Sequence, residues 1–512
     1  MAKIWIARVR TNHELAWRVP PLLRRGARAL RLGYIDRILS SIDGKPFLAQ
    51  MTTYYLAALG EATARARGVE HEFHVVEAPE ASLHIPDDAD AVLFTVNTTA
   101  ALATYRVADE LRRRGIPVVL GGIHVTMLPE EAAGHADGIA TGEAEAVFDE
   151  LLDDLERVGR PRPIYRGGRV ESLAGLPRPC WPRPEEDDVC PWVIPVQTSR
   201  GCRNACAFCS TTRHQGAHRR HRPVEDIVAE IRAYQESGFY NGDKAFFLTD
   251  NNSVSDTDHR HGLRDTTYAK RLFRALAPLG VTWSGQGEIS VADDPELLDL
   301  LAAAGCRNLL VGFESLDQAN LGNVGKVGNR VEDYVRRIEA LHRHNIRLIG
   351  CFMLGLDHDT PAVFDRTAEF VQRWIDIPQI SVLTPFPGTA LYARFEREGR
   401  ILSRDWSRYD ITHVVYRPKR MSPDELEQGY RDVLRRVFSW PNMVGRSTRN
   451  ALHGTDPGIH RPSTWDRWVS TLAPNLVYGS LGWVDPEDAE AARTHRARSE
   501  SVRPAADAGH AA

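Results

Sequence analysis

The sequence has few cysteines and no long apolar run. Only 7 of its 512 residues are cysteine, which is too few for a fold held together by disulfides. No run of about 18 apolar residues, the length that a membrane-spanning helix needs, occurs in it. The first residues, MAKIWIARVR, carry charges where a secretion signal would place its apolar core. We therefore expect a cytoplasmic protein with no transmembrane segment.

The chain also lacks a marked excess of charge of either sign. Its 64 lysines and arginines nearly balance 68 aspartates and glutamates, which leaves a formal net charge of -4. Because binding to nucleic acids depends on neutralising phosphates, this balance predicts no nucleic acid partner. No Ser-His-Asp or paired-carboxylate signature is evident either. With 43% hydrophobic residues, the chain can bury the cores of two or three domains.

The first third of the chain alternates strand-like and helix-like segments. Short apolar runs at 72–78, 91–97 and 117–122 are accompanied by a helical pattern near 100–114. This alternation predicts a doubly wound, Rossmann-like α/β domain over residues 1–158. Such sheets bind ligands beyond the carboxyl ends of their strands. The residues found at those ends are Thr95, Asn97, Gly121, Gly122, His124, Gly142 and Glu143.

The rest of the chain divides into four segments by composition. Residues 159–191, rich in Pro, Gly and Arg, are expected to form a linker. Residues 192–400 contain six strand-like runs separated by helical patterns, which predicts a partial barrel of six βα units rather than the closed eight-unit form. Residues 401–485 are expected to form a small mixed or helical capping region. Residues 486–512 lack apolar periodicity and are expected to be a disordered tail.

Three cysteines are grouped directly after the first strand of the predicted barrel. They form the pattern C-x3-C-x2-C and are Cys202, Cys206 and Cys209. Three thiolates on a short loop can bind three irons of a four-iron, four-sulfur cluster, which leaves the fourth iron without a protein ligand. The alternative is a zinc site of three thiolates and one imidazole, with His214, His218 or His221 as the fourth ligand.

This motif and its position resemble those of the radical S-adenosylmethionine enzymes, and the resemblance covers residues 192 to about 400. It implies that the three cysteines hold a 4Fe-4S cluster and that S-adenosylmethionine chelates the fourth iron. It also implies that reduction by a partner such as flavodoxin or ferredoxin yields a 5'-deoxyadenosyl radical. The positions that the resemblance assigns to S-adenosylmethionine binding are Phe208, Asp250, Gln286, Glu314 and Gly355.

An α/β domain in front of such a barrel resembles the cobalamin-binding subclass of that family. The stretches PVVLGGIHVTMLPEEAAGHADGIATGEAEAVFDELL and FMLGLDHDTPAVFDRTAEF are similar to that subclass. The resemblance implies cobalamin binding at the strand-end residues of the first domain named above. The D-x-H-x-x-G motif, which supplies an axial histidine to cobalt in some members, is absent. No lower ligand is therefore named, and His124 is expected to be a loop residue at the edge of the ligand.

The resemblance implies an enzyme that methylates an unactivated carbon of a small-molecule or lipid substrate, in specialised metabolism or lipid modification. A 5'-deoxyadenosyl radical would remove hydrogen, and methylcobalamin would deliver the methyl group. An alternative is a radical enzyme that catalyses cyclisation, rearrangement or oxidation, with cobalamin non-methylating or absent. A further alternative is a zinc-stabilised binding module without chemistry, although polar residues at the ends of six predicted barrel strands argue against it.

Overall fold

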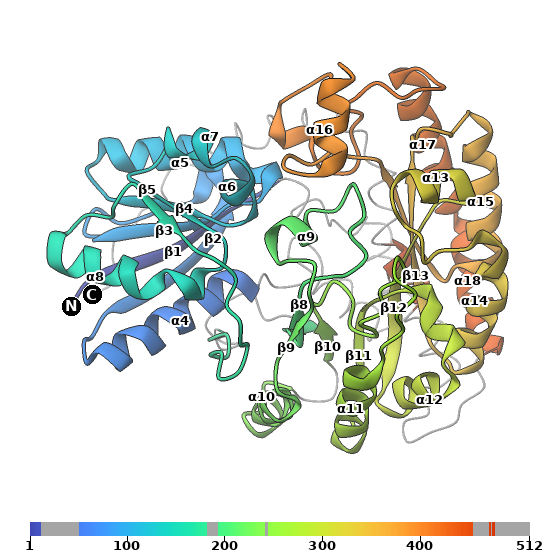
Figure 1. Cartoon of the computed structure of the whole chain (residues 1–512), viewed down its shortest axis with the longest axis horizontal. Helices are drawn as coiled ribbons and strands as arrows, with labels where there is room; N and C mark the ends of the chain where they lie inside the picture. The colour runs from blue at the N-terminus through green and yellow to red at the C-terminus, as the bar shows by residue number, and fades with distance from the viewer. Residues whose placement is uncertain (12–50, 182–192, 241–243, 454–470, 473, 477–512) are drawn as a thin grey trace, which may run out of the picture.

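The computed structural model describes residues 1–11, 51–181, 193–240, 244–453, 471–472 and 474–476. It contains two six-stranded parallel sheets, which lie side by side in Figure 1, and a small antiparallel hairpin. The predicted fold class, a doubly wound domain followed by a partial barrel of six βα units, is confirmed. The predicted disordered tail at 486–512 lies outside the described residues.

The N-terminal sheet has the strand order β2-β1-β3-β4-β5-β6. Its strands are β1 (Lys3–Arg10), β2 (Glu72–Pro79), β3 (Ala91–Thr95), β4 (Val118–Gly121), β5 (Gly138–Thr141) and β6 (Ile164–Arg166). Strand β6 lies in the segment expected to be a linker. It joins the sheet because Tyr165 is buried and β6 pairs with β5.

Helices cover both faces of this sheet. They are α4 (Met51–Arg67), α5 (Ala101–Arg113), α6 (Ile123–Met127), α7 (Pro129–Ala133) and α8 (Phe148–Val158). Along β3, Val92 and Phe94 pack with α5, whereas Leu93 packs with α4 and α8. Successive strand residues point to opposite faces, so each face of the sheet has its own core. This two-sided burial explains why the strands read as continuous apolar runs.

The second sheet has the strand order β7-β10-β11-β12-β13-β14, and it is open, because no pairing joins β7 to β14 in the described chain. Its strands are β7 (Val193–Val196), β10 (Ala245–Leu248), β11 (Trp283–Gly287), β12 (Cys306–Glu314), β13 (Arg347–Leu354) and β14 (Ile377–Val382). The helices around it are α10 (Val224–Glu236), α11 (Thr267–Leu276), α12 (Pro295–Ala303), α13 (Gln318–Asn323), α14 (Tyr334–Arg343), α15 (Ala362–Trp374) and α16 (Ala390–Arg397). The loop after β7 contains two short paired strands, β8 (Ser199–Arg200) and β9 (Arg220–His221). The cysteine segment and α9 (Thr211–His214) lie between them.

The C-terminal region contains α17 (Pro423–Val437) and α18 (Trp440–His453). Helix α17 begins at a capping box in which Ser422 and Glu425 exchange hydrogen bonds. The segment before it packs against the N-terminal domain, where Trp406 lies in the core of the first sheet and its indole donates to Glu131 at 3.0 Å. The N-terminal domain and the C-terminal region are thus in contact through this segment, on the upper side of the molecule in Figure 1.

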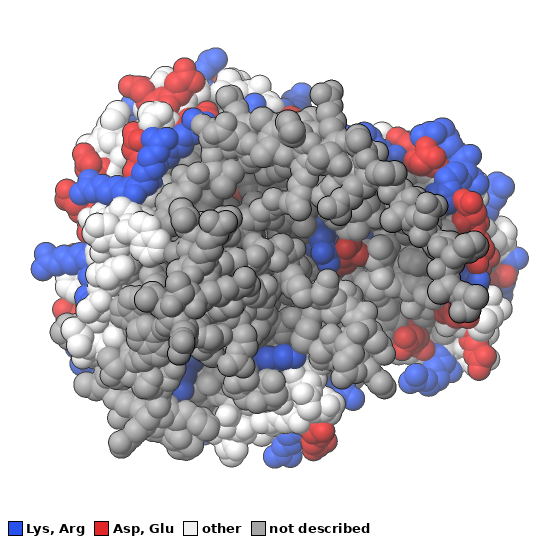
Figure 2. Space-filling view, turned by 180° about the vertical axis from the view of Figure 1, so that it is seen from behind, with Lys and Arg blue, Asp and Glu red and all other residues white. Residues whose placement is uncertain are grey.

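The described surface mixes charges of both signs. On the face shown in Figure 2, basic and acidic side chains lie next to one another along the visible rim. Among the described residues, no helix is both long enough and apolar enough to cross a lipid bilayer.

We expect Gly122→Ala to destabilise the N-terminal domain more than Gly115→Ala does. Both glycines have positive φ, 98° and 82°, so each alanine pays a conformational cost of about 1 kcal/mol. Only at Gly122 would the new Cβ also meet backbone, 2.7 Å from the amide nitrogen of Val96, whereas nothing lies within 4 Å of it at Gly115. Urea unfolding monitored by circular dichroism should show an extra loss of about 1–3 kcal/mol for Gly122→Ala. Equal losses would contradict the close approach at Gly122.

Candidate functional site

The three motif cysteines lie on one loop that starts at the carboxyl end of β7. Gly201 begins the loop with φ of 97°, and a Cβ there would overlap the carbonyl oxygen of His218, so only glycine fits. The amide of Cys202 donates to Gly216 O at 3.2 Å, and the amide of Cys209 donates to Cys206 O at 3.1 Å. These backbone bonds give the loop a defined shape without any bound group.

The loop is also tied to the rest of the barrel. The amide of Ala207 donates to Val324 O at 2.8 Å, and Ala207 O accepts from the amide of Leu391 at 2.8 Å. Phe208 packs against the barrel core. The cysteine loop is therefore held between the segment after α13 and the start of α16.

The cysteines are partly buried free thiols. Burial raises the pKa of Cys202, and it raises the pKa of Cys206 to about 12. Iron binds the thiolate rather than the thiol, so loading of a cluster would release protons from this loop.

The two metal centres that the sequence leaves open differ in the fourth ligand that they need. Across the described ranges, no three His, Cys, Asp or Glu side chains converge where they could hold one metal ion, as a zinc site would require. His221, one candidate fourth ligand, instead contacts Asp256 at 2.9 Å and stacks on Tyr268. Because a 4Fe-4S cluster takes each thiolate on a different iron, three sulfur donors on one loop fit it, and the zinc alternative gains no support.

Asp250 is hydrogen-bonded to the residues that precede the cysteine loop. Its carboxylate accepts hydrogen bonds from the amides of Thr198 at 2.8 Å and Ser199 at 2.9 Å, as well as from both hydroxyls. It is 1% exposed and lies 3.6 Å from the guanidinium of Arg219. Protein donors surround this carboxylate, and Asp250 fixes the strand end from which the cysteine loop starts, while its expected contact with S-adenosylmethionine stays a prediction.

Glu314 pairs with a lysine that sequence reasoning missed. Glu314 ends β12 with φ of 66°, and its Oε1 lies 2.9 Å from Lys326 Nζ. Burial alone would lower the pKa of Lys326, but Glu314 and the thiols of Cys206 and Cys202 raise it above its usual value. Gly312 leaves space for the pair, because a Cβ there would overlap Glu314 Oε1. A partly buried cation and a buried carboxylate thus lie beside the cysteine loop.

Lys326 follows α13 in the segment GKVGN, which has no spacing that links it to the cysteines. Only the folded chain brings it near them. Nothing in the sequence pattern could have identified it.

Two other expected S-adenosylmethionine contacts lie at strand ends of the same sheet. The main-chain oxygen of Gln286 accepts from the amide and hydroxyl of Ser253, both at 2.7 Å, while no hydrogen bond of its side chain is seen. Gly355 has φ of 93°, and its main-chain oxygen accepts from the hydroxyl of Tyr416 at 2.5 Å. A Cβ at Gly355 would overlap that hydroxyl, so packing against Tyr416 already requires glycine here.

The loop after Gly355 is held by Asp359. Its Oδ2 accepts from the amides of Gly355 at 3.0 Å and Leu356 at 2.9 Å, and Asn320 Nδ2 donates to Oδ1 at 2.7 Å. Burial raises the pKa of Asp359 to about 6 in spite of these bonds. The carboxylate therefore organises the loop that follows β13.

In the N-terminal domain, the expected ligand residues divide into backbone turns and side chains. Gly121 and Gly122 lead from β4 into α6 beside Thr95, and Gly142 turns the chain after β5 with φ of 82°. A Cβ at Gly142 would overlap the carbonyl oxygen of Gly167. The glycines at these strand ends thus allow close packing of neighbouring backbone.

His124 lies in a helix rather than in a loop, and its expected place at the edge of the ligand stays a prediction. It is in helix α6, fully buried, with its two ring nitrogens 3.3 Å from Thr98 Oγ1 and 3.3 Å from Glu131 Oε1. Burial lowers its pKa, and its ring meets Trp406 edge-on at 5.6 Å. His124 belongs to the contact between the N-terminal domain and the C-terminal region.

Glu143 forms an interdomain contact, and its expected role in cobalamin binding stays a prediction. It is 5% exposed, and its carboxylate forms a two-fold ion pair with Arg220, at 2.5 and 2.8 Å. It lies at the contact between the N-terminal domain and the β8–β9 hairpin rather than in an open pocket. Its negative charge is already balanced by the partner domain.

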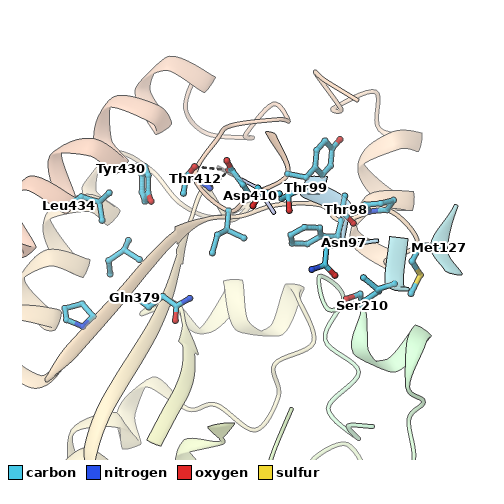
Figure 3. A pocket seen from close by; sticks show the side chains of 18 of the residues that line it. Asn97, Thr98, Thr99, Met127, Ser210, Gln379, Asp410, Thr412, Tyr430 and Leu434 are labelled. Atoms are coloured by element: carbon cyan, nitrogen blue, oxygen red, sulfur yellow. Dashed lines mark hydrogen bonds between the residues drawn. The ribbon is translucent and has the colours of Figure 1, made fainter. Parts of the chain in front are cut away.

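A cavity of about 490 Å³ lies between the two sheets. It is lined by Thr11, Asn97, Thr98, Thr99, Ile123, Met127, Ser210, Pro378, Gln379, Ile380, Phe386, Pro387, Tyr409, Asp410, Ile411, Thr412, Tyr430, Leu434 and Phe438. Figure 3 shows Asn97, Thr98 and Met127 of the N-terminal domain on one side, Ser210 of the cysteine segment close to them, and Gln379, Tyr430 and Leu434 across the cavity. Segments from both domains and from the C-terminal region thus meet around one space.

The cavity wall is mostly apolar and carries neutral hydrogen-bonding groups. The described lining contains no Lys, Arg or His. Its one carboxylate, Asp410, accepts from the amide and hydroxyl of Thr412 at 2.9 and 2.8 Å and contacts His413 at 2.8 Å. Such a wall suits a large uncharged ligand with amide or hydroxyl groups at its periphery.

Three family models match consecutive parts of the chain. The radical SAM superfamily matches residues 196–371, and the B12 binding domain matches residues 61–152. A domain of unknown function matches residues 389–477. The first two matches coincide with the second and the first sheet, respectively.

Two curated relatives are similar over most of their length. The chain is 30% identical to bacteriochlorophyllide d C-12(1)-methyltransferase of Chlorobaculum tepidum, over 72% of this chain and 80% of the relative. It is also 30% identical to bacteriochlorophyllide d C-8(2)-methyltransferase of the same organism, over 77% of this chain and 87% of the relative. Among solved structures, the radical S-adenosylmethionine methyltransferase TsrM of Kitasatospora setae, with cobalamin and a 4Fe-4S cluster bound, has the same fold. It matches with a TM-score of 0.55 at 17% identity, over 84% of this chain and 85% of that chain.

We expect Asp250→Ala to loosen the cysteine loop before any cofactor is added. The change leaves two amides and the Arg219 cation without their buried acceptor, at a cost of about 2–4 kcal/mol in unfolding free energy. Alkylation of the loop thiols, followed by mass spectrometry of the full-length protein, should become faster. Asp226→Ala is the matched control, because Asp226 accepts one amide hydrogen bond, from Gly175, at an exposed position. Unchanged thiol reactivity in Asp250→Ala would refute this role.

Proposed function

The chain belongs to the cobalamin-binding radical S-adenosylmethionine enzymes, and from this premise we propose that it methylates an unactivated carbon of a small-molecule or lipid substrate. The observation that carries the proposal is that the cysteine segment and the carboxyl edge of the N-terminal sheet border one cavity. Ser210, directly after Cys209, and Asn97, which follows β3, both line it. A substrate in this cavity would contact both domains at once.

When bound, the cluster with S-adenosylmethionine supplies a carbon-centred radical that removes hydrogen, and cobalamin supplies the methyl group. In this assignment Cys202, Cys206 and Cys209 hold the cluster. The cysteine loop keeps its shape through backbone hydrogen bonds, so the three sulfurs are preorganised for the cluster. The chain needs no general base for hydrogen-atom removal, which agrees with the absence of an acid-base signature in the sequence.

The Glu314–Lys326 pair is suited to the methionyl part of S-adenosylmethionine. That part carries an ammonium group and a carboxylate, and the pair offers the opposite charges beside the cysteine loop. Charge-assisted hydrogen bonds are the strong ones in a buried site. We assign Glu314 to the ammonium group and Lys326 to the carboxylate.

The neutral cavity wall suits both cobalamin and an uncharged substrate. The periphery of the corrin ring carries amide groups, and Asn97, Thr98 and Gln379 can exchange hydrogen bonds with amides. Without a cation in the described lining, the cavity offers no counter-ion for a phosphate or phosphonate. The relatives at 30% identity are named for a tetrapyrrole substrate, which is likewise large and mainly apolar. We therefore favour an uncharged, largely apolar acceptor.

We further propose that the enzyme works in the cytoplasm with a reducing partner such as flavodoxin or ferredoxin. The described cysteines are all free thiols, as expected in a reducing compartment. Cleavage of S-adenosylmethionine needs an electron, and the chain offers no second group of cysteines that could carry one.

Anaerobic reconstitution with iron, sulfide and cobalamin tests the proposed cofactors. We expect about four irons and one cobalamin per chain, with 5'-deoxyadenosine and S-adenosylhomocysteine formed from S-adenosylmethionine under reduction. The variant with Cys202, Cys206 and Cys209 all changed to Ala should lose iron and both products. Cys180→Ala, at an exposed cysteine, is the control and should lose neither.

The possible outcomes separate the candidate functions. A methylated product from a neutral polycyclic substrate would support methylation. Iron and 5'-deoxyadenosine without cobalamin binding would instead favour a non-methylating radical reaction. Zinc in place of iron would refute the proposal as a whole.

The role of the Glu314–Lys326 pair predicts a selective loss of S-adenosylmethionine affinity. Lys326→Met and Glu314→Gln should each weaken binding by about 10- to 100-fold, since each removes a charge-assisted hydrogen bond. Equilibrium dialysis on reconstituted protein measures this, with iron content checked in parallel. Lys270→Met removes a lysine that pairs with Asp294 at 3.0 Å away from the loop, and should bind as the wild type does. Unchanged affinity in both pair variants would remove the pair from the binding site.

A further inference from the structure

The contact between the N-terminal domain and the cysteine segment is made by buried ion pairs. Glu143 and Glu145 follow β5, and they meet Arg200 and Arg220 of the β8–β9 hairpin. Arg220 holds both oxygens of Glu143, at 2.5 and 2.8 Å, and Arg200 reaches Glu145 at 2.6 Å and Glu143 at 3.5 Å. We call these four residues the interdomain clamp.

The clamp has further partners on both sides. Glu143 Oε2 accepts from the amide of Val170 at 2.8 Å, and the hydroxyl of Tyr55 donates to Glu145. Arg200 Nε donates to Gln197 Oε1 at 2.8 Å. Burial alone would raise the pKa of Glu145, but Arg200 and Tyr55 bring it below its usual value.

Such ion pairs restrict the relative orientation of the two segments more than they stabilise the contact. A buried ion pair regains little beyond its desolvation cost, but a bidentate arginine–carboxylate pair tolerates only a narrow range of geometry. The clamp therefore specifies how the hairpin sits on the N-terminal domain. An apolar contact of the same area would allow more sliding.

The clamp is connected to the cysteine loop by direct contacts. Arg220 Nη2 donates to Gln215 O at 2.9 Å, and Gln215 Oε1 accepts from the amide of Gly201 at 3.2 Å. Gly201 precedes Cys202, whose amide is bonded to Gly216. Arg200 is itself paired with Arg220 across the hairpin. A shift of Glu143 would thus be passed to the first cysteine through its ion pair with Arg220, two hydrogen bonds and the peptide bond that joins Gly201 to Cys202.

We propose that Glu143 and Glu145 are positioning residues that hold the cysteine loop at a fixed distance and angle from the N-terminal domain. The inference rests on the proposed function, in which the loop carries the cluster and the N-terminal domain carries cobalamin. Both centres must reach the same substrate carbon, and a displacement of about 1 Å can cost about 100-fold in rate. The clamp sets the relative position of the two centres before the substrate binds.

The first test uses the full chain without cofactors. Hydrogen exchange in Glu143→Gln should become about tenfold faster in peptides from residues 199–222, while peptides from the core of the second sheet stay unchanged. Glu230→Gln is the matched control. It removes a pair that is at least as buried, Glu230–Arg222 at 2.7 Å, and that lies within the barrel. Exchange of the segment that carries the cysteines, 202–216, should stay unchanged. Equal exchange in Glu143→Gln and the wild type would overturn the inference.

The second test measures the distance between the two centres in reconstituted protein. Pulsed electron paramagnetic resonance between the reduced cluster and cob(II)alamin should give a narrow distribution in the wild type and Glu230→Gln. In Glu143→Gln the distribution should become roughly twice as broad, although iron and cobalamin contents are retained. Glu145→Gln, which leaves the Glu143–Arg220 pair intact, serves if Glu143→Gln does not fold, and should broaden it less.

The two proposals fail in different ways. If the wild type binds neither iron nor cobalamin, the proposed function is wrong, and the hydrogen-exchange result still judges the clamp. If both centres bind and the distance distribution of Glu143→Gln equals that of the wild type, the positioning role is wrong and the proposed function stands.

Discussion

The site depends on one constraint, the direction in which the backbone leaves β7. Asp250 imposes that direction, because its carboxylate accepts hydrogen bonds from the amides of Thr198 and Ser199 where the strand ends. Gly201 then turns the chain in a conformation that no larger residue could adopt without overlap. Thiols on so short a loop can serve one cluster only when this turn is fixed.

Buried ion pairs lie within the barrel, as Glu230–Arg222 does, and also at the contacts between domains. The clamp joins the N-terminal domain to the hairpin, and Glu131 receives both His124 and Trp406 where the C-terminal region meets the same domain. Ion pairs at these contacts cost desolvation free energy, but they fix the relative orientation of the segments that they join. One apolar core crosses such a contact as well, because Trp406, Tyr409 and Val415 pack into the core of the first sheet. Apolar burial thus builds the domains and also joins the C-terminal region to the first of them, and charge adds orientation at these contacts.

The sequence was sufficient for the architecture but not for the task of every polar residue. Alternating apolar runs and a spaced cysteine motif are local patterns, so the two sheets and the cysteine loop followed from them. Asp250, Glu143 and His124 also lie at strand ends or just after them, as expected. However, the sequence cannot distinguish a polar residue that faces a ligand from one that contacts a neighbouring segment. The structure shows all three buried against neighbouring segments, and their expected ligand contacts stay predictions. Lys326 required the folded chain, since only tertiary structure brings it to Glu314.

Helix α17 lines the cavity on the side opposite the cysteine segment. Helix α17 begins at its own capping box and packs on α15. Tyr430 and Leu434 of this helix, and Phe438 directly after it, line the cavity. Tyr430 and Leu434 lie across the cavity from Ser210, which follows the cysteines. Evolution can therefore reshape the acceptor pocket one helix face at a time while the chemistry is inherited intact. A single scaffold of this kind can diversify its products without having to rediscover how to make a radical.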